Sequence, residues 1–452
     1  MSTGRDMTLG DAQESPASSA IAQSLAALER WFAGWRAEDG GYRGLIATFW
    51  DGSDTWIASH VMNSYPVILG YRDLYSRFGD PRFLDRARED AEYLLAHQMP
   101  SGLFTHAFGD VPGKGTGPVV QACPGLSLAR LASTLRDAGE PWETYAVAAQ
   151  RCAEGILSTW FDGRVLTNRV ANQELKTAEL LLALADLGVN RDRYLQIATL
   201  LGDWSRQQQV REPGPAYGGI YQADHDDRIF SVYVAKCIPP LVELSRLPGG
   251  RRFMDAAVAA GTFLQTRRDG QTGLFESHMM PAGTSSFRYR LAASVRGRLS
   301  HRVAGHRLEG LVRLRRRLGG GWTSVREPVW IARAASIVTA LLRLSEKGAL
   351  EYNPWADVRV LLSHQHPDGG FANAVGLGPG WRDRGPCPRW NAYVFQLLCH
   401  LTPAPPEPLQ STAPEPTFTI EEPGVDGTPR RVTFDRRHDL CVAHYAWEGG
   451  RE

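Results

Sequence analysis

The chain of 452 residues carries 50 basic and 49 acidic side chains, and 43% of its residues are hydrophobic. These proportions are typical of a globular protein and exclude a disordered or collagen-like chain. Because its net charge is +1, the chain has no overall attraction for nucleic acid, and we expect no nucleic-acid partner.

Cysteine usage and the N-terminal residues bear on the cellular compartment. The six cysteines include no C-x-x-C pair, which argues against a zinc site and against a disulfide framework. The N-terminus is polar and lacks the apolar core of a secretory signal, and no stretch approaches the roughly 20 apolar residues that span a bilayer. His364 and His366 are two residues apart and do not share a helix face, so they do not indicate a metal site. We therefore predict a cytoplasmic protein without a metal or cofactor.

Residues 1–17 are predicted to be disordered, and the chain beyond them reads as a series of helical hairpins. Hydrophobic periodicity predicts outer helices at about 18–37, 82–98, 141–160, 192–209, 252–267 and 354–365. Inner helices are predicted to begin near residues 54, 120, 171, 226, 328 and 388. In the second outer helix, the apolar residues that share one face are Phe83, Ala87, Ala91, Leu94 and Leu95.

A phrase recurs at the end of three hairpins. The segments YLLAHQMPSGLF, FLQTRRDGQTGLF and LLSHQHPDGGF share apolar residues, a glutamine, a glycine and a final phenylalanine. Repeats of this kind bury a continuous core by stacking, and six hairpins arranged around an axis close into a ring in which both flanks of each inner helix are buried. The sequence predicts an all-α (α/α)6 toroid over residues 18–402.

Three segments depart from the repeat. The inner-helix starts near 226 and 328 are about 100 residues apart, which predicts an insertion at about 270–327. Within it, residues 285–318 contain ten arginines and one acid, Glu309, and their second half has the pattern of a basic amphipathic helix. This segment could line a funnel for an anionic glycan, contact an anionic membrane or a lipid phosphate, or form a solvated lid. Residues 403–416 form a proline-rich linker, and residues 417–452 form an appendage that begins with a β-hairpin.

The repeat phrase, Q-x-x-x-G-x-F or Q-x-x-D-G-G-F, resembles the α/α-toroid proteins over roughly residues 18–402. One branch that it resembles contains six-hairpin glycosidases, unsaturated glucuronyl hydrolases, polysaccharide lyases and uronyl C5-epimerases. The other contains the class II terpene cyclases, whose acid lies in a D-x-D-D-T-A motif. The phrase identifies the architecture better than the chemistry. In such rings the N-termini of the inner helices open onto one end, so polar residues there converge on a cleft, whereas residues in the middle of the helices are expected only to pack.

The most informative inner-helix start is the stretch Asp224-His225-Asp226-Asp227-Arg228. Three neighbouring carboxylates repel one another and raise one pKa, while the helix dipole favours the ionised form of the others. A proton donor beside a stabilising anion is the arrangement that general acid catalysis requires. Ordinary capping of a helix by aspartate is the alternative interpretation.

The same stretch matches the D-x-D-D part of the cyclase motif, and this resemblance implies that Asp226 protonates an alkene. The next two residues depart from the motif, because Arg228 and Ile229 stand in place of Thr-Ala. A fixed cation beside the acid favours the ionised aspartate, whereas alkene protonation needs the protonated form.

Other inner-helix starts are suited to sugar chemistry. Glu174 follows two amides that can bind hydroxyl groups, and Asp54 lies between two tryptophans whose faces can stack on a sugar ring, although helix packing also explains tryptophans. The guanidinium of an arginine can bind a substrate carboxylate through two parallel hydrogen bonds. The alternative is that arginines at the inner-helix starts form ion pairs with neighbouring carboxylates of the protein. The predicted catalytic residues are Asp226, Asp227, Glu174 and Asp54. The predicted substrate contacts are Arg228, Arg389, Asn172, Gln173, Trp50, Trp56, Trp390 and His60.

These observations predict a carbohydrate-active enzyme, a hydrolase, lyase or epimerase, that acts on an acidic saccharide by carboxylate acid/base chemistry. One alternative is a class II terpene cyclase-like enzyme that uses Asp226 as its acid on a polyprenyl substrate. A further alternative is a non-catalytic toroid that binds a lipid or a protein. The expected partner is a small molecule or an oligosaccharide, with a peripheral membrane or lipid-phosphate contact open for residues 285–318.

Overall fold

The computed structural model describes residues 16–37, 39–42, 44–47, 54–57, 61–105, 117–224, 226–282, 321–326, 329–375, 387–406, 417–423, 429–435 and 442–446. Only the backbone is described for the strands at 44–47, 54–57 and 417–446. Of the residues singled out above, Trp50, His60 and His225 lie outside the described residues. The predicted disordered N-terminus up to residue 15, the arginine-rich segment 285–318 and linker residues 407–416 also lie outside them.

Six inner helices form a closed ring. They are α2 (Val61–Phe78), α4 (Pro118–Asp137), α6 (Ala171–Asp186), α8 (Ser231–Leu244), α12 (Ile331–Ser345) and α14 (Pro388–Leu401). Each inner helix packs against the next, and α14 packs against α2, which closes the ring.

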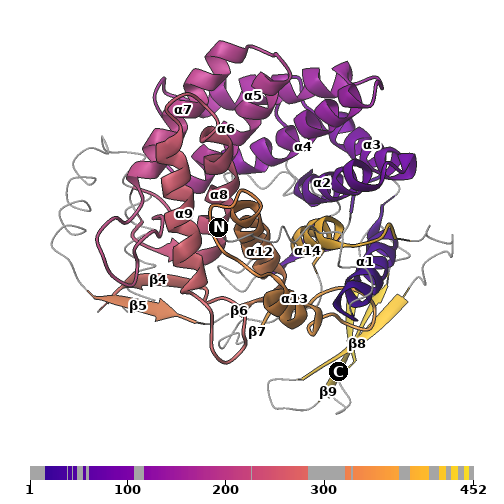
Figure 1. Ribbon diagram of the computed structural model, residues 1–452. Helices are drawn as coiled ribbons and strands as arrows, with labels where there is room; N and C mark the ends of the chain where they lie inside the picture. Colours follow the sequence, from indigo (N-terminus) through magenta and orange to yellow (C-terminus); the bar gives the residue numbers. More distant parts are fainter. Residues whose placement is uncertain are drawn as a thin grey trace, which may run out of the picture.

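Six outer helices surround this ring. They are α1 (Pro16–Trp35), α3 (Pro81–Ala96), α5 (Glu143–Trp160), α7 (Arg191–Gln207), α9 (Arg251–Gln265) and α13 (Trp355–Leu362). The helices α3, α5, α7, α9 and α13 pack on α2, α4, α6, α8 and α12, and α1 packs on α14, so the first helix of the chain completes the last hairpin (Figure 1). The fold is the predicted (α/α)6 toroid.

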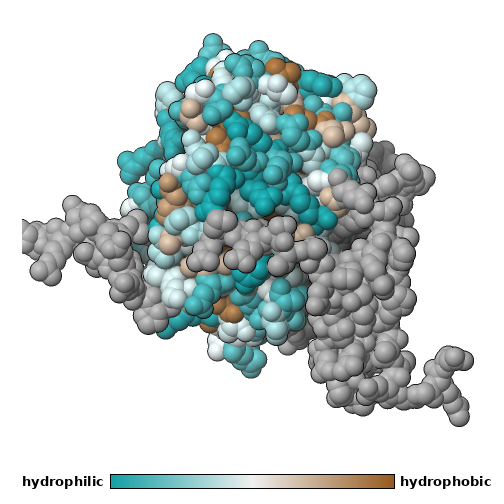
Figure 2. All heavy atoms as spheres, turned by 90° about the vertical axis from the view of Figure 1, so that its right-hand side faces the viewer, coloured by the Kyte–Doolittle hydropathy of each residue, from teal (hydrophilic) through white to brown (hydrophobic). Residues whose placement is uncertain are grey.

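Burial follows the two layers. All residues of α6 are buried except Gln173 and Asp186, because this inner helix is covered by its neighbours on both flanks and by α7. The outer helix α3 is amphipathic, and its predicted apolar face is buried at Phe83, Ala87 and Leu94. The face shown in Figure 2 is mainly hydrophilic, with hydrophobic residues in small separate groups. No described helix combines the length and the apolar composition required to cross a membrane.

The turns that follow the outer helices share one form, and the recurring phrase supplies three of them. An isolated β-bridge closes the turn after each of them, at Arg36↔Tyr42, Gln98↔Phe104, Phe161↔Leu166, Gln209↔Ile220, Arg268↔Phe275 and Gln365↔Phe371. At Gln98 and Gln365 of the phrase, and also at Gln209 in another turn, the glutamine amide donates to a glycine carbonyl within the turn and to a backbone carbonyl of the next outer helix. For Gln365 that second acceptor is the Ser24 carbonyl of α1, at 3.1 Å. The phrase therefore joins successive hairpins and closes the ring.

Short strands precede three inner helices and correct the predicted helix starts. Strand β2 (Asp54–Ile57) pairs with β1 (Gly44–Ala47), β3 (Ile229–Phe230) pairs with β4 (His278–Pro281), and β6 (Val329–Trp330) pairs with β7 (Ala374–Val375). The helices α2, α8 and α12 thus begin at 61, 231 and 331, rather than near 54, 226 and 328. The β-branched and aromatic residues before each helix favour strand pairing. The other three inner helices begin within two residues of the prediction.

The C-terminal appendage contains a three-stranded antiparallel sheet. Strand β8 (Thr417–Pro423) pairs with β9 (Pro429–Asp435), which is the predicted hairpin, and β9 also pairs with β10 (Val442–Ala446), which the sequence analysis did not anticipate.

Candidate functional site

The acidic loop, residues 224–228, lies immediately before β3 and α8, at the end of the ring where the inner helices begin. The side chains of Asp224, Asp226 and Asp227 are all buried, with relative exposures of 8%, 5% and 2%. The loop is therefore not a set of solvated surface carboxylates, and each charge must be stabilised by its neighbours.

Arg228 holds Asp226 through both carboxylate oxygens. Its Nε lies 3.0 and 3.1 Å from the two oxygens and its Nη2 lies 2.6 Å from Oδ2, and the backbone amide of Arg228 also donates to Oδ1 at 3.0 Å. The guanidinium also lies 5.0 Å from the centre of the Phe230 ring. Similarly, Arg169 contacts Asp224 at 3.1 Å. A guanidinium on both oxygens favours the ionised carboxylate, so the loop presents Asp226 as an anion fixed in one orientation.

A small sheet adjoins the acidic loop. Strand β4 pairs with β3 on one side and with β5 (Trp322–Val325) on the other, and Figure 1 shows β4 and β5 as a long pair beside the ring. The Ala282 amide donates to the Gly321 carbonyl at 2.6 Å, so the chain leaves and re-enters the described part at one place. The predicted insertion is thus attached directly beside the acidic loop.

Glu174 on α6 is completely buried and accepts the Leu166 amide at 2.9 and 3.1 Å. Burial raises the pKa of this carboxyl well above its usual range, and the neighbouring carboxylates Asp162 and Asp224 act in the same direction, while the Leu166 amide opposes them. The contact anchors the turn that follows α5. Beside it Asn172 is buried, and Gln173 accepts an amide hydrogen bond from Asn168 at 2.7 Å.

A stack of tryptophans and arginines occupies the first turns of α12 and α14. The guanidinium of Arg333 lies 4.3 Å from the Trp330 ring centre and 3.8 Å from that of Trp390, and the Arg389 guanidinium lies 5.1 Å from Trp390. Burial lowers the pKa of Arg333 to about 10, and repulsion from Arg389 contributes. The predicted contacts Arg389 and Trp390 are thus brought together, with Arg333 between two aromatic faces.

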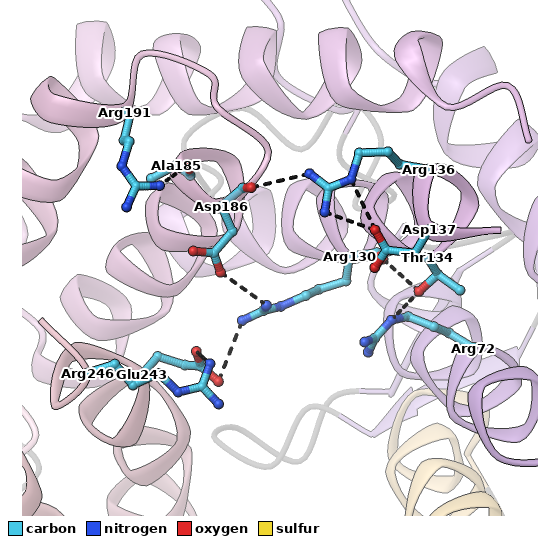
Figure 3. A network of polar contacts seen from close by, with 10 residues as sticks. All are labelled: Arg72, Arg130, Thr134, Arg136, Asp137, Ala185, Asp186, Arg191, Glu243 and Arg246. Carbon is cyan, nitrogen blue, oxygen red and sulfur yellow. Dashed lines mark hydrogen bonds and ion pairs between the residues drawn. The ribbon is translucent and has the colours of Figure 1, made fainter. Parts of the chain in front are cut away.

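An axial cavity of about 340 Å³ opens toward the other end of the ring and receives side chains from all six inner helices. Its floor contains Tyr65, Lys176, Glu179, Lys236 and Tyr393. Its mouth, at the C-terminal ends of the inner helices, contains Arg72, Asp73, Arg130, Glu243, Arg246, Arg343, Glu346 and Lys347. Figure 3 shows Arg130 extending from α4 towards Asp186 of α6 and Glu243 of α8, with ion-pair distances of 3.9 and 3.8 Å. None of the predicted site residues whose side chains the structure describes lines this cavity.

Two lysines on the cavity floor are in different electrostatic environments. Lys176 donates to Glu179 at 2.5 Å and to the Tyr65 hydroxyl at 3.3 Å. Burial alone would lower the pKa of Lys176, but Glu179, Tyr65 and Cys123 together outweigh it and the pKa is raised well above its usual value. Lys236 donates to the Tyr393 hydroxyl at 3.2 Å, and burial lowers its pKa to about 7.

These floor residues were not predicted from the sequence, because residues in the middle of the inner helices were expected only to pack, and that expectation was wrong. A detectable signal was present for Lys236, which stands in the largely apolar stretch SVYVAKCIPPLVEL. Lysine in such a position must either pair or lose its charge. Among the described residues, no group of histidine, cysteine and acidic side chains could hold a metal ion.

The ring of six hairpins with a polar axial cavity defines the class of this protein as an (α/α)6 toroid, and the solved structures that it resembles share that fold. A D-mannose isomerase matches with a TM-score of 0.54 at 11% identity, covering 86% of this chain and 100% of that chain. The cellobiose 2-epimerase from Bacillus thermoamylovorans has a TM-score of 0.56 at 11% identity, covering 84% and 98%. An inactive α-1,6-mannanase variant from Salegentibacter sp., with two aspartates replaced and α-1,6-mannotetrose bound, has a TM-score of 0.50 at 13% identity, covering 85% and 99%. No protein-family model matches the chain, and no curated protein matches it by sequence.

Proposed function

We propose that the chain is a carbohydrate-active enzyme that acts on an acidic saccharide by carboxylate acid/base chemistry at the acidic loop. The observation that carries this proposal is the buried Asp226 carboxylate, fixed on both oxygens by Arg228 and followed directly by the buried Asp227. The isomerase, the epimerase and the mannanase of similar fold are named for activities on sugars, and the mannanase variant that lacks two aspartates is described as inactive.

The geometry favours a base rather than a strong acid at Asp226. An ionised carboxylate can remove a proton from water, as in inverting hydrolysis, or from a carbon next to a carboxylate, as in elimination or epimerisation. In this proposal Asp227 supplies the second proton transfer and Asp54 the opposing carboxylate, while Glu174, enclosed and bound to Leu166, acts as a positioning residue. The proposed sugar contacts are Asn172, Gln173, Trp50, Trp56, Trp390 and His60.

Arg389 supports an acidic substrate. Within the described part of the chain, its guanidinium has no carboxylate partner, and its one described contact is the Trp390 ring. A cation held at an inner-helix start with no counter-ion among the described residues is suited to bind the carboxylate of a uronic acid and to stabilise the enolate-like charge formed when the neighbouring proton leaves. The attachment of the arginine-rich segment beside the acidic loop, through β4 and β5, supports a contact with the same anionic substrate rather than with lipid.

The same geometry disfavours the cyclase alternative. Protonation of an alkene requires an aspartic acid that carries its proton before the reaction. Arg228 contacts both oxygens of Asp226, and a protonated carboxyl could not accept these contacts equally. A cytoplasmic location remains part of the proposal, and the five described cysteines, all buried free thiols, support a reducing compartment.

The test incubates the protein with acidic oligosaccharides, neutral oligosaccharides and polyprenyl diphosphates, with mass-spectrometric detection of products. We expect turnover of an acidic saccharide, and we expect Asp227→Asn to abolish it without a change in the melting temperature. Asp226→Asn alone would leave the partly buried Arg228 charge without its partner, so it is paired with the double variant Asp226→Asn/Arg228→Gln, which removes both charges.

Asp224→Asn is the matched control, because this carboxylate belongs to the same loop but pairs with Arg169. It should retain most of the turnover. Full turnover in the Asp227→Asn variant would remove this residue from the mechanism, and cyclisation of a polyprenyl diphosphate would overturn the saccharide proposal.

A further inference from the structure

Lysine is rare in this chain and is concentrated at the axial cavity. The chain contains four lysines, Lys114, Lys176, Lys236 and Lys347, whereas the remainder of its 50 basic residues are arginines. Three of the four line the axial cavity, two on its floor and one at its mouth. Arginine keeps its charge in almost any environment, whereas burial readily shifts the pKa of lysine. The axial cavity is therefore lined by the type of basic residue whose protonation state depends on its surroundings.

The surroundings of Lys236 favour the neutral amine. Its one described hydrogen bond is to the Tyr393 hydroxyl at 3.2 Å, and its Nζ lies 4.6 Å from the centre of the Tyr393 ring. Among the described residues it has no carboxylate partner. Burial lowers its pKa to about 7, and the cations Arg333, Arg389 and Lys176 on three other inner helices act in the same direction, whereas Cys123 on α4 opposes them. About half of the Lys236 side chains are therefore neutral at pH 7.

Lys176 provides a contrast on the same floor. Its ammonium is bound to Glu179 at 2.5 Å, and Glu179, Tyr65 and Cys123 together outweigh burial and raise its pKa well above the usual value. At pH 7 the cavity floor therefore presents an ammonium group on α6 and, on α8, an amine that is uncharged in about half of the molecules. An uncharged lysine amine near other cations is the arrangement that activates lysine as a nucleophile.

We propose that Lys236 is a nucleophilic amine that condenses with the carbonyl group of a small anionic aldehyde or ketone bound in the axial cavity. The anionic part of the ligand would meet the guanidinium groups of Arg72, Arg130 and Arg343 at the mouth. Repulsion from Arg130 and Arg343 adds to burial in lowering the pKa of Arg72, which indicates that the three cations converge. The ion pairs of Arg130, at 3.8 and 3.9 Å, are loose enough for an incoming anion to compete with them (Figure 3).

The condensation balances without an oxidant or a reductant. The lone pair of the Lys236 nitrogen forms a bond to the carbonyl carbon, and the electron pair of the carbonyl π bond moves to oxygen. The resulting carbinolamine loses its oxygen, together with the two amine hydrogens, as water, which leaves a carbon–nitrogen double bond. Tyr393 is placed to transfer these protons, because burial raises the pKa of its hydroxyl and keeps it protonated.

The inference goes beyond the proposed saccharide function and does not depend on it. The axial cavity opens at the ends of the inner helices opposite to the acidic loop, and none of the four described residues of that loop lines it. A failure of one proposal would therefore leave the other unaffected, and separate measurements test them.

The experiment treats the intact protein with glyoxylate and sodium cyanoborohydride at pH 7 and follows carboxymethylation of each lysine by peptide mass spectrometry. We expect Lys236 to be modified at least about tenfold faster than the exposed Lys347 and the ion-paired Lys176, since an ordinary lysine is neutral in fewer than about one molecule in a thousand at this pH. The rate at Lys236 should rise through pH 7 and then level off. Equal rates at Lys236 and Lys347, or labelling of Lys236 only above about pH 9, would overturn the proposal.

Two comparisons make the test specific. Glycolaldehyde, an uncharged aldehyde of similar size, should label Lys236 more slowly than glyoxylate if the mouth arginines attract the ligand, and equal labelling would contradict that part of the proposal. Lys176→Arg should leave the pH profile at Lys236 with its midpoint near 7, because arginine preserves the neighbouring charge. If the labelling of Lys236 in the Lys176→Arg variant no longer had its midpoint near pH 7, the positive charges around Lys236 would not be the cause of its reactivity.

Discussion

Substitution of Gly369 tests the contact between the turn after α13 and helix α1, which closes the ring. This glycine lies in the turn after α13 with a φ of +98°, and a Cβ placed on it would lie 2.3 Å from the Ala27 carbonyl oxygen of α1 and 3.3 Å from the Trp31 Cβ. The turn therefore touches the backbone of the first helix. We expect Gly369→Ala to force α1 away from α13 and to weaken the contact that completes the last hairpin.

The expected loss in the free energy of unfolding of Gly369→Ala has two contributions. A left-handed conformation costs a residue with a Cβ about 1–2 kcal/mol. The 2.3 Å approach is roughly 1 Å inside van der Waals contact, and relieving it by shifting packed elements costs a further 1–3 kcal/mol or so. Gly348 is the matched control, because its φ is +63° and nothing lies within 4 Å of its Cβ position. Gly348→Ala should lower the free energy of unfolding only by the cost of the left-handed conformation, about 1–2 kcal/mol.

The assay combines thermal unfolding with hydrogen exchange of the purified variants. Gly369→Ala should lower the melting temperature by clearly more than Gly348→Ala, and faster exchange should be confined to the amides of α1 and of the turn. Equal losses in the two variants would refute the close approach of the turn to α1. Faster exchange spread evenly over all six hairpins would refute its role in closing the ring.

Two further predictions concern buried carboxyl groups. Burial raises the pKa of Asp90 to about 7, although Arg36 and the Tyr42 hydroxyl, which donates to Asp90 at 3.1 Å, act in the opposite direction. The folded state then keeps a proton that the unfolded chain loses near pH 4, so stability falls as the pH rises from about 4 to 7, and Asp90→Asn should flatten that part of a melting-temperature profile; an unchanged slope would contradict the assignment. Glu174→Gln retains an acceptor for the Leu166 amide and should keep both turnover and stability, whereas Glu174→Leu should lower the free energy of unfolding by about 1–3 kcal/mol. Lost turnover in a Gln variant with an unchanged melting temperature would instead identify Glu174 as catalytic.

The helices can be predicted well from the sequence because the pattern that marks a helix lies within the helix itself. Apolar residues at three- and four-residue spacing mark each helix, and the starts of α4, α6 and α14 fall within two residues of the prediction. The starts of α2, α8 and α12 were placed too early, because short strands precede them. Phe230 pairs with His278 and Trp330 pairs with Ala374, and partners so distant in the chain leave no local pattern.

In the candidate site, too, contacts between residues close in the sequence could be predicted, whereas contacts between distant residues could not. The carboxylates of the acidic loop and the bond between Asp226 and its neighbour Arg228 are close in the sequence, and a fixed cation beside the acid was expected. The pairing of Asp224 with Arg169 joins residues 55 positions apart, and that of Lys236 with Tyr393 joins residues 157 positions apart. These contacts exist only because the closed ring brings separate hairpins to one axis. The axial cavity could therefore not be recognised before the ring was built.

The repeat itself indicates where the chemistry of the axial cavity can differ from one toroid to another. Gln98 and Gln365 of the recurring phrase are occupied in joining the hairpins, so they specify the ring and carry no information about a substrate. The sixth residues of four inner helices, in contrast, are Lys176, Lys236, Ser336 and Tyr393, and all four line the axial cavity. Because equivalent positions of a closed repeat lie at similar heights along its axis, these side chains face one another at one level. The identity of the residue at this position, and not the repeat phrase, determines whether the axis presents a charge, a hydroxyl or a reactive amine.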